Sequence, residues 1–424
     1  MTSVSFVRHL AVTMVILSIT TCVPVFGEDW PCWRGANHDD MCTETDLLES
    51  WPAGGPDQLW VNKDTGLGYA GISIAGDHLY TMGLFDDTEV ALCLNAENGD
   101  ELWRVDIGEI FENGWGDGPR STPTIDDNRV YFMAAQGNLV CCDRENGEIV
   151  WKVAMQDFGG GIPQWGYAES PLVDGDKVIC TPGGSEGMVL ALDKMTGDKI
   201  WQSEPFETRN RRGQTTAAPA HYSSVVPAVL DGKKQYVQLT VACLTGISEE
   251  GETLWQVEWP GRIAVIPSPV ISENRVYATS GYGIGSMAVE VDGDDAETMW
   301  RNQVMKNHHG GVIHKDGNLY GHSDQTGFIC QSLETGELVW NERNIKKGAV
   351  LWADDRFYHI EEQGGRVLLI NATEDGAEIT GEFVLSPQTE LRKPQGRIWM
   401  HPVIADGKLY LRDQEILHCY DIRE

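Results

Sequence analysis

Apolar residues in this chain recur in short runs that alternate with polar ones, as in "STPTIDDNRVYFM" and "PSPVISENRVYAT". Each run predicts two short strands joined by a tight turn rich in Asp, Asn and Gly. A third apolar run follows, for example "MVLALD", and then a Gly-containing turn and a short strand that ends in Trp. No long amphipathic helical period interrupts the series, so the pattern predicts an all-β chain.

The strand that ends in Trp marks an internal repeat. It returns at intervals of 40 to 54 residues, which is the length of one four-stranded propeller blade. A large flat side chain at the same place in successive units suits packing between adjacent sheets, so we expect this Trp column to be structural. Degenerate copies end at Trp300 and Thr380. The full copies end at Trp103 ("ENGDELW"), Trp151 ("ENGEIVW"), Trp201 ("MTGDKIW"), Trp255 ("EEGETLW") and Trp340 ("ETGELVW").

Counting the opening segments predicts an eight-bladed β-propeller. The last unit ends at "HCYDIRE" without a Trp strand of its own, whereas "QLW", ending at Trp60, is an orphan strand near the N-terminus. We therefore expect this N-terminal strand to complete the last blade, which would close the ring and leave no open sheet edge at the seam. The opening segments lie near Ile72, Pro123, Pro171, Pro227, Pro269, Gly311, Ala349 and Pro402.

The first residues have the pattern of a secretory signal peptide. Arg8 precedes the apolar run "LAVTMVILSIT", and small or apolar residues before Gly27 suit cleavage after it. Lipidation of Cys22 is the less favoured alternative, because "ITTC" lacks a small residue just before the cysteine. The sequence thus predicts a signal peptide over residues 1–27, an N-terminal extension over 28–58 and the propeller over 59–424. The protein is expected to be exported, to the periplasm or beyond the cell.

The charge of the chain restricts its partners. Its 64 acidic residues outnumber 32 basic ones, for a formal net charge of -32. Such a surface disfavours nucleic acid and anionic membranes. No apolar run of membrane-spanning length follows the N-terminus, so no transmembrane segment is expected in the mature chain.

The cysteines raise two questions of pairing. The adjacent Cys141 and Cys142 resemble a vicinal disulfide, but the repeat register equates Cys141 with Cys93, Ala191 and Cys330, a column of small apolar residues. Neighbouring strand residues also point to opposite faces, so we expect both to be packed thiols. In the extension, Cys32 and Cys42 lie ten residues apart, and in an oxidising compartment a disulfide between them would staple a segment without its own core.

The repeat "LALDKMTGDKIW" resembles that of quinoprotein-like eight-bladed propellers, a superfamily that includes pyrroloquinoline-quinone (PQQ) alcohol dehydrogenases and the assembly lipoprotein BamB. A narrower resemblance is to exported PQQ-like repeat proteins of planctomycete bacteria. It rests on "WPCWRGA", "GDGPRSTPT", "NHHGG" and "LYLRDQEILHCYD". The resemblance implies the eight-bladed fold over nearly the whole mature chain and makes PQQ with Ca²⁺ a candidate cofactor.

In a propeller the first strand of each blade lines the central channel, so functional side chains are sought just before and within the opening segments. These segments carry more aromatic, His and Arg residues than an acidic surface requires. They would suit a planar, sugar-like or anionic ligand, or a protein partner, at the channel mouth. The alternative is a structural plug whose members satisfy one another. The candidates are Trp115, Arg120, Trp165, Tyr167, Glu169, His221, Tyr222, His308, His309, Trp399 and His401.

A catalytic set is harder to assemble from these residues. In a quinoprotein, Glu169 would be the cation ligand and Trp165 or Trp399 the stacking surface, but the entry to the fifth unit, "GRIAVIPSPV", carries no Asp base. No C-x-x-C-H haem motif is present. Zinc is not expected, since adjacent strand residues such as those in "NHHGG" face opposite ways. The sequence therefore favours a non-catalytic binding or scaffold module. A PQQ-dependent alcohol or sugar dehydrogenase, or a polysaccharide hydrolase or lyase using Glu169 and His308, is the alternative.

Overall fold

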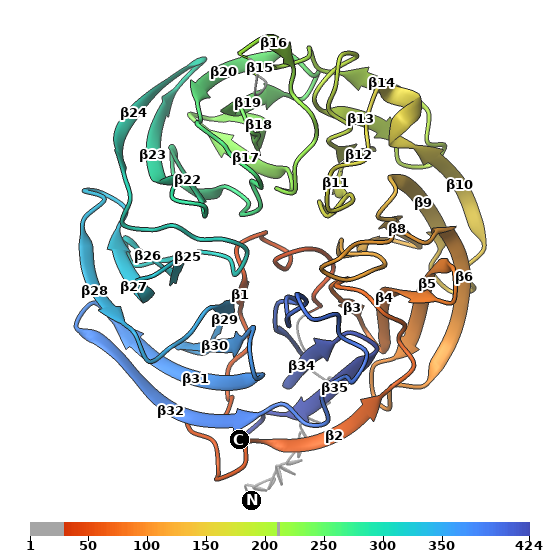
Figure 1. Cartoon of the computed structure of the whole chain (residues 1–424), viewed down its shortest axis with the longest axis vertical. Coiled ribbons are helices and arrows are strands. Elements are labelled where there is room, and N and C mark those ends of the chain that lie inside the picture. Colours follow the sequence, from red (N-terminus) through yellow and green to blue (C-terminus); the bar gives the residue numbers. More distant parts are fainter. Residues whose placement is uncertain (1–28, 210–212) are drawn as a thin grey trace, which may run out of the picture.

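The computed structural model describes residues 29–209 and 213–424. The expected signal peptide over residues 1–27 and Cys22 lie outside the described residues. The described chain forms a ring of eight antiparallel sheets, so the all-β, eight-bladed propeller is confirmed (Figure 1). A single 3-10 helix, η1 (Met155–Phe158), interrupts the strands of the described residues. No helix in the described parts of the chain is long and apolar enough to span a bilayer.

Each blade is an antiparallel meander whose strands follow chain order from the channel outwards. Blades 1 and 2 are β3 (Ser73–Ala75), β4 (His78–Phe85), β5 (Thr88–Asn95), β6 (Glu101–Glu109); and β7 (Thr124–Asp126), β8 (Arg129–Met133), β9 (Asn138–Asp143), β10 (Ile149–Ala154). Blades 3 and 4 are β11 (Leu172–Asp174), β12 (Lys177–Cys180), β13 (Leu190–Asp193), β14 (Lys199–Gln202); and β17 (Val226–Leu230), β18 (Lys233–Leu239), β19 (Cys243–Ser248), β20 (Thr253–Glu258).

The second half of the ring repeats this order. Blades 5 and 6 are β21 (Val270–Ser272), β22 (Arg275–Ser280), β23 (Gly285–Asp292), β24 (Asp295–Asn302); and β25 (Ile313–Lys315), β26 (Asn318–Ser323), β27 (Gly327–Ser332), β28 (Leu338–Glu342). Blades 7 and 8 are β29 (Gly348–Ala353), β30 (Arg356–Glu361), β31 (Arg366–Thr373), β32 (Gly376–Val384); and β33 (Val403–Ala405), β34 (Lys408–Asp413), β35 (Ile416–Asp421).

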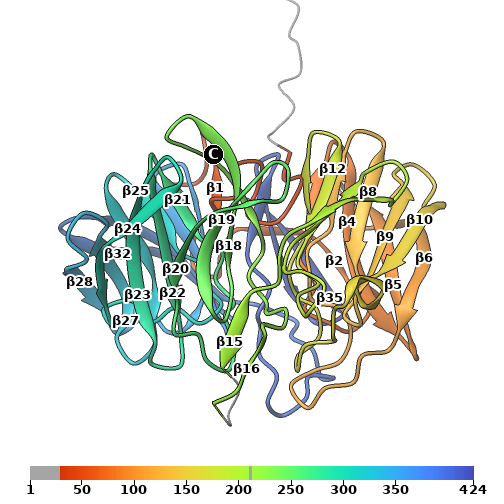
Figure 2. The same ribbon diagram turned by 90° about the horizontal axis from the view of Figure 1, so that it is seen from above.

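The eighth blade is closed as predicted by a strand from the N-terminal side. β2 (Asp57–Asn62) pairs antiparallel with β35, and Trp60 lies opposite Cys419. Two further elements lie outside the repeat. β1 (Met41–Cys42) adds to blade 7 in parallel with β29, and the hairpin of β15 (Glu207–Arg209) and β16 (Thr215–Ala217) projects from the ring (Figure 2).

The repeated Gly and Trp of the motif meet across blade boundaries. The indole nitrogen Nε1 of Trp103 donates to the carbonyl oxygen of Arg144 at 3.1 Å, in the turn of the next blade. Trp103 also covers Gly147 of that turn, where a Cβ atom would lie 2.6 Å from the ring and φ is +74°. A side chain is therefore excluded twice, by the ring and by the left-handed backbone. Trp151 repeats both contacts with the third blade, so each Trp joins its blade to the next.

In blade 7 the predicted position of the repeated Trp column, Thr380, was wrong by one residue. Thr380 is the bulge residue that the ladder skips, and Gly381 takes the Trp position, opposite Leu369. Trp51 from the N-terminal extension fills the space over Gly381, whose Cβ would lie 2.7 Å from that of Trp51. The ring of Trp51 lies 5.9 Å from that of Tyr358, the same separation as Trp103 keeps from its own blade's tyrosine. The extension thus supplies the aromatic side chain that blade 7 lacks.

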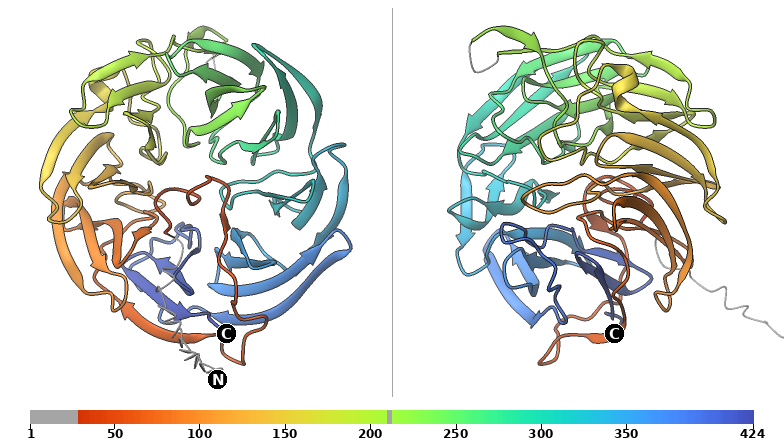
Figure 3. Two further views of the ribbon diagram at one scale, coloured as in Figure 1. Left: turned by 180° about the vertical axis from the view of Figure 1, so that it is seen from behind. Right: turned by 45° about the vertical axis from the view of Figure 1, so that its right-hand side comes forward.

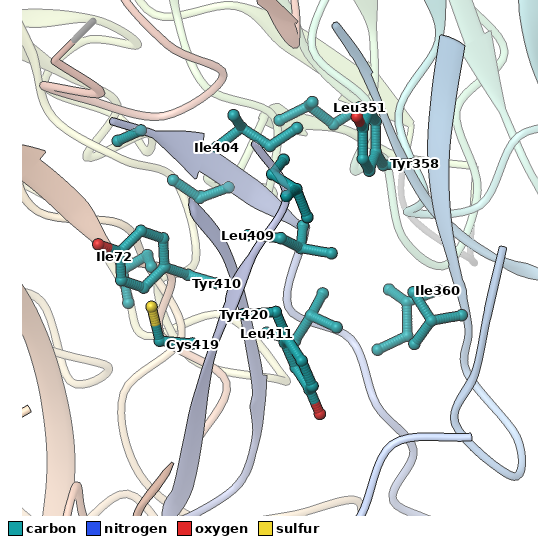
Figure 4. Close-up of a cluster of buried hydrophobic side chains, with 14 of the residues drawn as sticks. Ile72, Leu351, Tyr358, Ile360, Ile404, Leu409, Tyr410, Leu411, Cys419 and Tyr420 are labelled. Carbon is teal, nitrogen blue, oxygen red and sulfur yellow. The ribbon is translucent and has the colours of Figure 1, made fainter. Parts of the chain in front are cut away.

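A continuous apolar core joins blades 7, 8 and 1 with the extension. In Figure 4, Tyr410 and Cys419 lie on the side of Ile72, whereas Leu411 lies on the side of Ile360. The alternation is that of strands buried on both faces, which explains why the strands carry nearly unbroken apolar runs.

The vicinal cysteines and the two cysteines of the extension lie in different surroundings. Cys141 packs in the core between blades 2 and 3 and Cys142 in the core between blades 1 and 2, so the vicinal pair consists of two buried thiols on opposite faces. Cys32 and Cys42 both lie in the described part of the chain, and no bond joins them. Cys42 is fixed in β1 against β29, while the Cys32 thiol donates to the carbonyl oxygen of Gly35 at 3.1 Å. The two are held by different parts of the structure, and the disulfide between them stays a prediction from their spacing.

Candidate functional site: an aromatic cavity closed by the N-terminal extension

The N-terminal extension crosses one end of the central channel (Figure 3). It starts against blade 1, where the backbone of Trp30 exchanges hydrogen bonds of 2.9 and 2.8 Å with Ile74. It reaches blade 7 on the other side, where the Trp352 amide donates to the carbonyl oxygen of Asp40 at 2.9 Å. The channel is therefore a cavity with a floor rather than a through-pore.

Two side chains of the extension form this floor. Trp33 donates through Nε1 to the Ser268 hydroxyl at 3.2 Å, and its ring lies 4.5 Å from that of His401. Arg34 donates to Asp40 Oδ2 at 2.6 Å and to the carbonyl oxygen of Val312 at 2.7 Å, and the ion pair is almost wholly buried. Burial alone would raise the pKa of Asp40, but Arg34 and His401 hold that pKa below its ordinary value.

The cavity above this floor has a volume of about 220 Å³. Its walls are aromatic and come mainly from the loops that lead into the first strands of most blades, as expected for ligand sites. The lining side chains with rings or charges are Trp33, Arg34, Tyr69, Trp115, Arg120, Trp165, Tyr222, Tyr282, His308, His309, Trp399 and His401.

Hydrogen bonds to backbone carbonyls fix these walls. Arg120 donates to the carbonyl oxygens of Trp165 at 2.5 Å and of Gly116 at 2.6 Å, and its guanidinium lies 5.6 Å from the ring centre of Tyr69. The Tyr69 hydroxyl donates to the Trp115 carbonyl oxygen at 2.5 Å. Burial lowers the pKa of Arg120 from its ordinary value, which still leaves the group charged near neutral pH.

Trp399 and His309 form a second cluster on a partly buried carboxylate, that of Glu362. Both donate to Glu362 Oε2, from Trp399 Nε1 at 3.0 Å and from His309 Nε2 at 3.0 Å. Burial would raise the pKa of Glu362, but His309 and Trp399 together bring it down to about 2. The carboxylate is thus ionised at all physiological pH values and orients the two rings.

Eight of the eleven candidate residues line this cavity: Trp115, Arg120, Trp165, Tyr222, His308, His309, Trp399 and His401. Tyr167, Glu169 and His221 do not belong to the lining. Tyr167 is buried and donates to the carbonyl oxygens of Gly161 and Pro182. His221 Nδ1 accepts from the Val265 amide at 3.2 Å, and burial lowers its pKa to about 4.

Glu169 lies behind the wall rather than on it. Its Oε1 accepts from the Thr181 amide, its side chain is 1% exposed, and burial raises its pKa to about 7. The neighbours Ala168 and Ser170 line the cavity instead. An extended backbone sends successive side chains to opposite sides, so this segment turns one set inward and the other into the blade.

Sequence reasoning missed Trp33, Arg34 and Tyr282. The first two belong to "WPCWRGA" in the extension, and Tyr282 to the turn "GYGI" between β22 and β23. All three lie outside the opening segments that were searched. The available signal for Tyr282 was an aromatic residue between two glycines in a turn.

A family model described as outer membrane protein assembly factor BamB matches residues 86–342 of this sequence. The chain belongs to this family. A BamB protein of Kangiella koreensis is 24% identical over 194 residues, 45% of this chain and 43% of that protein. The dehydrogenase subunit of an alcohol dehydrogenase (quinone) of Gluconacetobacter polyoxogenes is 26% identical over 207 residues, 45% of this chain and 27% of that subunit. The chain spans less than half the length of both relatives.

Solved structures agree with the propeller fold. BamB of Moraxella catarrhalis superposes with a TM-score of 0.58 at 15% identity, over 83% of this chain and 96% of that one. A quinohemoprotein alcohol dehydrogenase of Comamonas testosteroni gives 0.63 at 11% identity, over 93% and 80%. At these identities the likeness shows the fold alone.

The quinoprotein relatives make PQQ with Ca²⁺ worth testing against the lining residues. Ca²⁺ takes six or more oxygen ligands and favours carboxylates. No Asp or Glu is among the residues that line the cavity, and Glu169 offers its Oε1 to Thr181. Within residues 29–209 and 213–424, no group of three or more His, Cys, Asp or Glu side chains is placed to hold a metal ion. The aromatic walls could stack on a planar ring, but the residues present do not fit the cation.

Proposed function

We propose that the protein is an exported, non-catalytic binding propeller, which holds a ligand in its central cavity and serves as a scaffold for a protein partner. The observation that carries this proposal is the closed floor beneath aromatic walls. A cavity with one entrance buries most of the surface of what enters it, and burial of aromatic and apolar surface drives association.

The fixed geometry of the walls also favours binding. The rings of Tyr69 and Trp399 lie 4.8 Å apart, and those of Trp115 and Trp399 lie 6.2 Å apart. Because Arg120 and Tyr69 hold the loop of Trp115 through its backbone, little side-chain freedom remains to be lost when a ligand binds. A preformed site of this kind needs no chemical step to explain it.

The BamB relatives support the scaffold part of the proposal. They are named outer membrane protein assembly factors, and a comparable role for this chain would place it outside the cytoplasm with a protein partner. The expected signal peptide supports the same location.

A PQQ-dependent alcohol or sugar dehydrogenase is the second candidate. It is favoured by the likeness to quinohemoprotein alcohol dehydrogenase and by aromatic walls that suit a planar cofactor. The absence of carboxylates from the lining in the described chain weighs against it.

One experiment tests both candidates. The purified protein is titrated with 2-naphthalenemethanol, a neutral planar probe, by isothermal titration calorimetry. We expect one site per chain, weakened at least tenfold in Trp115→Ala, because a wall ring is lost. Leu102→Ala is the matched control, since Leu102 is similarly exposed but lies on an outer strand.

A second sample receives PQQ and Ca²⁺ and is assayed for dye-linked oxidation of ethanol and glucose. Turnover there, or no probe binding, would overturn the proposed function.

A further inference from the structure

Three serine hydroxyls of the cavity already accept a hydrogen bond from the protein. Ser170 Oγ accepts from the Thr122 amide at 2.8 Å, and Ser224 Oγ accepts from the Ser170 amide at 3.0 Å. Ser268 Oγ accepts from Trp33 Nε1 at 3.2 Å. A hydroxyl that accepts in this way keeps its own hydrogen to donate. These three groups therefore present O–H donors to the cavity.

Two tyrosines at the mouth show the same polarity. Tyr222 Oη accepts from the Trp165 amide at 3.4 Å, and Tyr282 Oη lies 2.8 Å from His308 Nε2. Lys347 Nζ contacts the other nitrogen of His308, Nδ1, and an ammonium can only donate. Nδ1 is therefore the acceptor, Nε2 carries the hydrogen, and Tyr282 Oη accepts it. Both phenols have an O–H left for a ligand.

The backbone at Tyr282 is strained in a way that aims its ring. Tyr282 has φ +56° and Gly283 has φ +76°, and the Ile284 amide closes the turn on the carbonyl oxygen of Gly281 at 3.2 Å. A bulky side chain in this left-handed region costs on the order of 1 to 3 kcal/mol. The turn places the Tyr282 ring 4.5 Å from that of His308. The strained backbone of Tyr282 therefore brings its hydroxyl to the cavity, where it is the second phenol donor beside that of Tyr222.

The charge of the cavity is also one-sided. The Arg34 charge is paired with Asp40, whereas Arg120 forms no ion pair with any carboxylate of the described residues. Arg120, Tyr222 and Tyr282 all line this one cavity. No lining side chain carries a negative charge. The lining side chains thus include a cation and O–H donors but no anion, and the ionised Glu362 lies outside the lining, hydrogen-bonded to His309 and Trp399.

Two buried imidazole nitrogens do not change this polarity. His309 Nδ1 and His401 Nδ1 have no hydrogen-bond partner within the described residues, but both atoms are buried. His401 Nδ1 lies 3.6 Å from Asp40, on the side of the floor. The groups exposed to a ligand remain donors.

We infer that the cavity selects a carboxylate carried on a planar, apolar body. The aromatic walls would cover the body, while Arg120, Tyr222 and Tyr282 would bind the carboxylate oxygens through charge-assisted hydrogen bonds. This inference rests on the proposed function, because it names the ligand class of the same site. It requires no metal ion and no covalent step.

Three probes share a naphthalene ring and differ in charge, so they separate the effect of charge on binding from the effect of ring shape. They are 2-naphthoate, 2-naphthalenemethanol and 2-naphthylmethylammonium. Dissociation constants are measured by calorimetry on the purified chain at pH 7.5. We expect the carboxylate to bind at least tenfold more tightly than the alcohol, and the ammonium to bind more weakly than both. A hydrogen bond to a charged group is worth roughly this factor or more.

The variant Tyr282→Phe removes one donor from a partly exposed turn without removing a buried group. It should weaken 2-naphthoate about tenfold and leave the alcohol within about twofold. Tyr420→Phe is the control: its phenol accepts from Gln58 Nε2 within blade 8 and lies outside the cavity lining, so the ratio of the two constants should stay unchanged.

The outcomes distinguish the two proposals. If the alcohol binds as tightly as the carboxylate, or if Tyr282→Phe leaves their ratio unchanged, the carboxylate inference is wrong while the cavity remains a binding site. If none of the three probes binds, the proposed function fails as well.

Discussion

Replacing Glu169 by Gln should stabilise the protein at pH 8 by about 3 kcal/mol and change little near pH 4.5. Glu169 is 1% exposed, and its Oε2 has no hydrogen-bond partner in the described chain. Burial raises its pKa from 4.5 to about 7, against the opposing hydrogen bonds from Thr181. Gln keeps the acceptor for the Thr181 amide and has the same shape, but it cannot ionise.

The sign and the size follow from proton linkage. Between pH 4.5 and about 7 the folded protein keeps the Glu169 proton while the unfolded chain has released it, so stability falls as pH rises. The loss is complete above about pH 7. A shift of about 2.5 pKa units corresponds to about 3 kcal/mol, and because the group is buried no solvent screening reduces it.

The assay is urea unfolding of the wild-type protein and Glu169→Gln at half-unit steps from pH 4.5 to 8.5. The difference between their free energies of unfolding removes the contribution of all other titrating groups. It should rise from about zero to about 3 kcal/mol across the window. The exposed Glu148→Gln serves as control and should show no such rise. A flat difference for Glu169→Gln would refute the reasoning, since the ionised carboxylate would then be solvated in the folded state.

Two further predictions concern the aromatic contacts between blades, and one the thiols. Trp151→Ala should lower the free energy of unfolding by roughly 3 to 5 kcal/mol in urea, because it removes the packing between blades 2 and 3; a near-native melting temperature would contradict this. Trp51→Ala should cost about 3 kcal/mol, and Trp51→Phe less, since Trp51 covers Gly381. The native protein should not react with Ellman's reagent until it is unfolded, because every described cysteine is buried and burial raises the pKa of Cys32 to about 12; rapid labelling of the native protein would contradict it.

The repeat made the fold predictable because most copies make the same contact. A Trp covers the next blade's Gly at five of the blade boundaries, from Trp60–Gly99 to Trp300–Gly336, and this contact leaves a regular spacing in the sequence from which the blades can be counted. Where the contact is made differently, the spacing misleads. Gly381 replaces the Trp of blade 7, and the aromatic group comes from Trp51, more than 300 residues away in the chain. No local pattern records such an exchange.

The site was predictable as a place but not as a set of side chains. The opening segments do surround the cavity, yet Tyr167 and Glu169 turn away while Ala168 and Ser170 face it. The sequence predicts that successive side chains alternate in direction. Which of the two sets faces the cavity depends on how the blade is rotated relative to the channel. The floor of the cavity could not be predicted from the sequence for another reason. Nothing in "WPCWRGA" indicates that Trp33 and Arg34 would cross the ring, because their partners come from blades 5, 6 and 8.

The closure of blade 8 sets an order of assembly for the whole molecule. β2 is the first blade strand in the chain and pairs with β35, the last, so the two can pair only after the whole chain has been synthesised. The ring of blades is therefore closed last, by the pairing of β2 with β35. A chain cut before β35 would keep most of its blades but expose Trp60 and an open edge, which are features that promote aggregation.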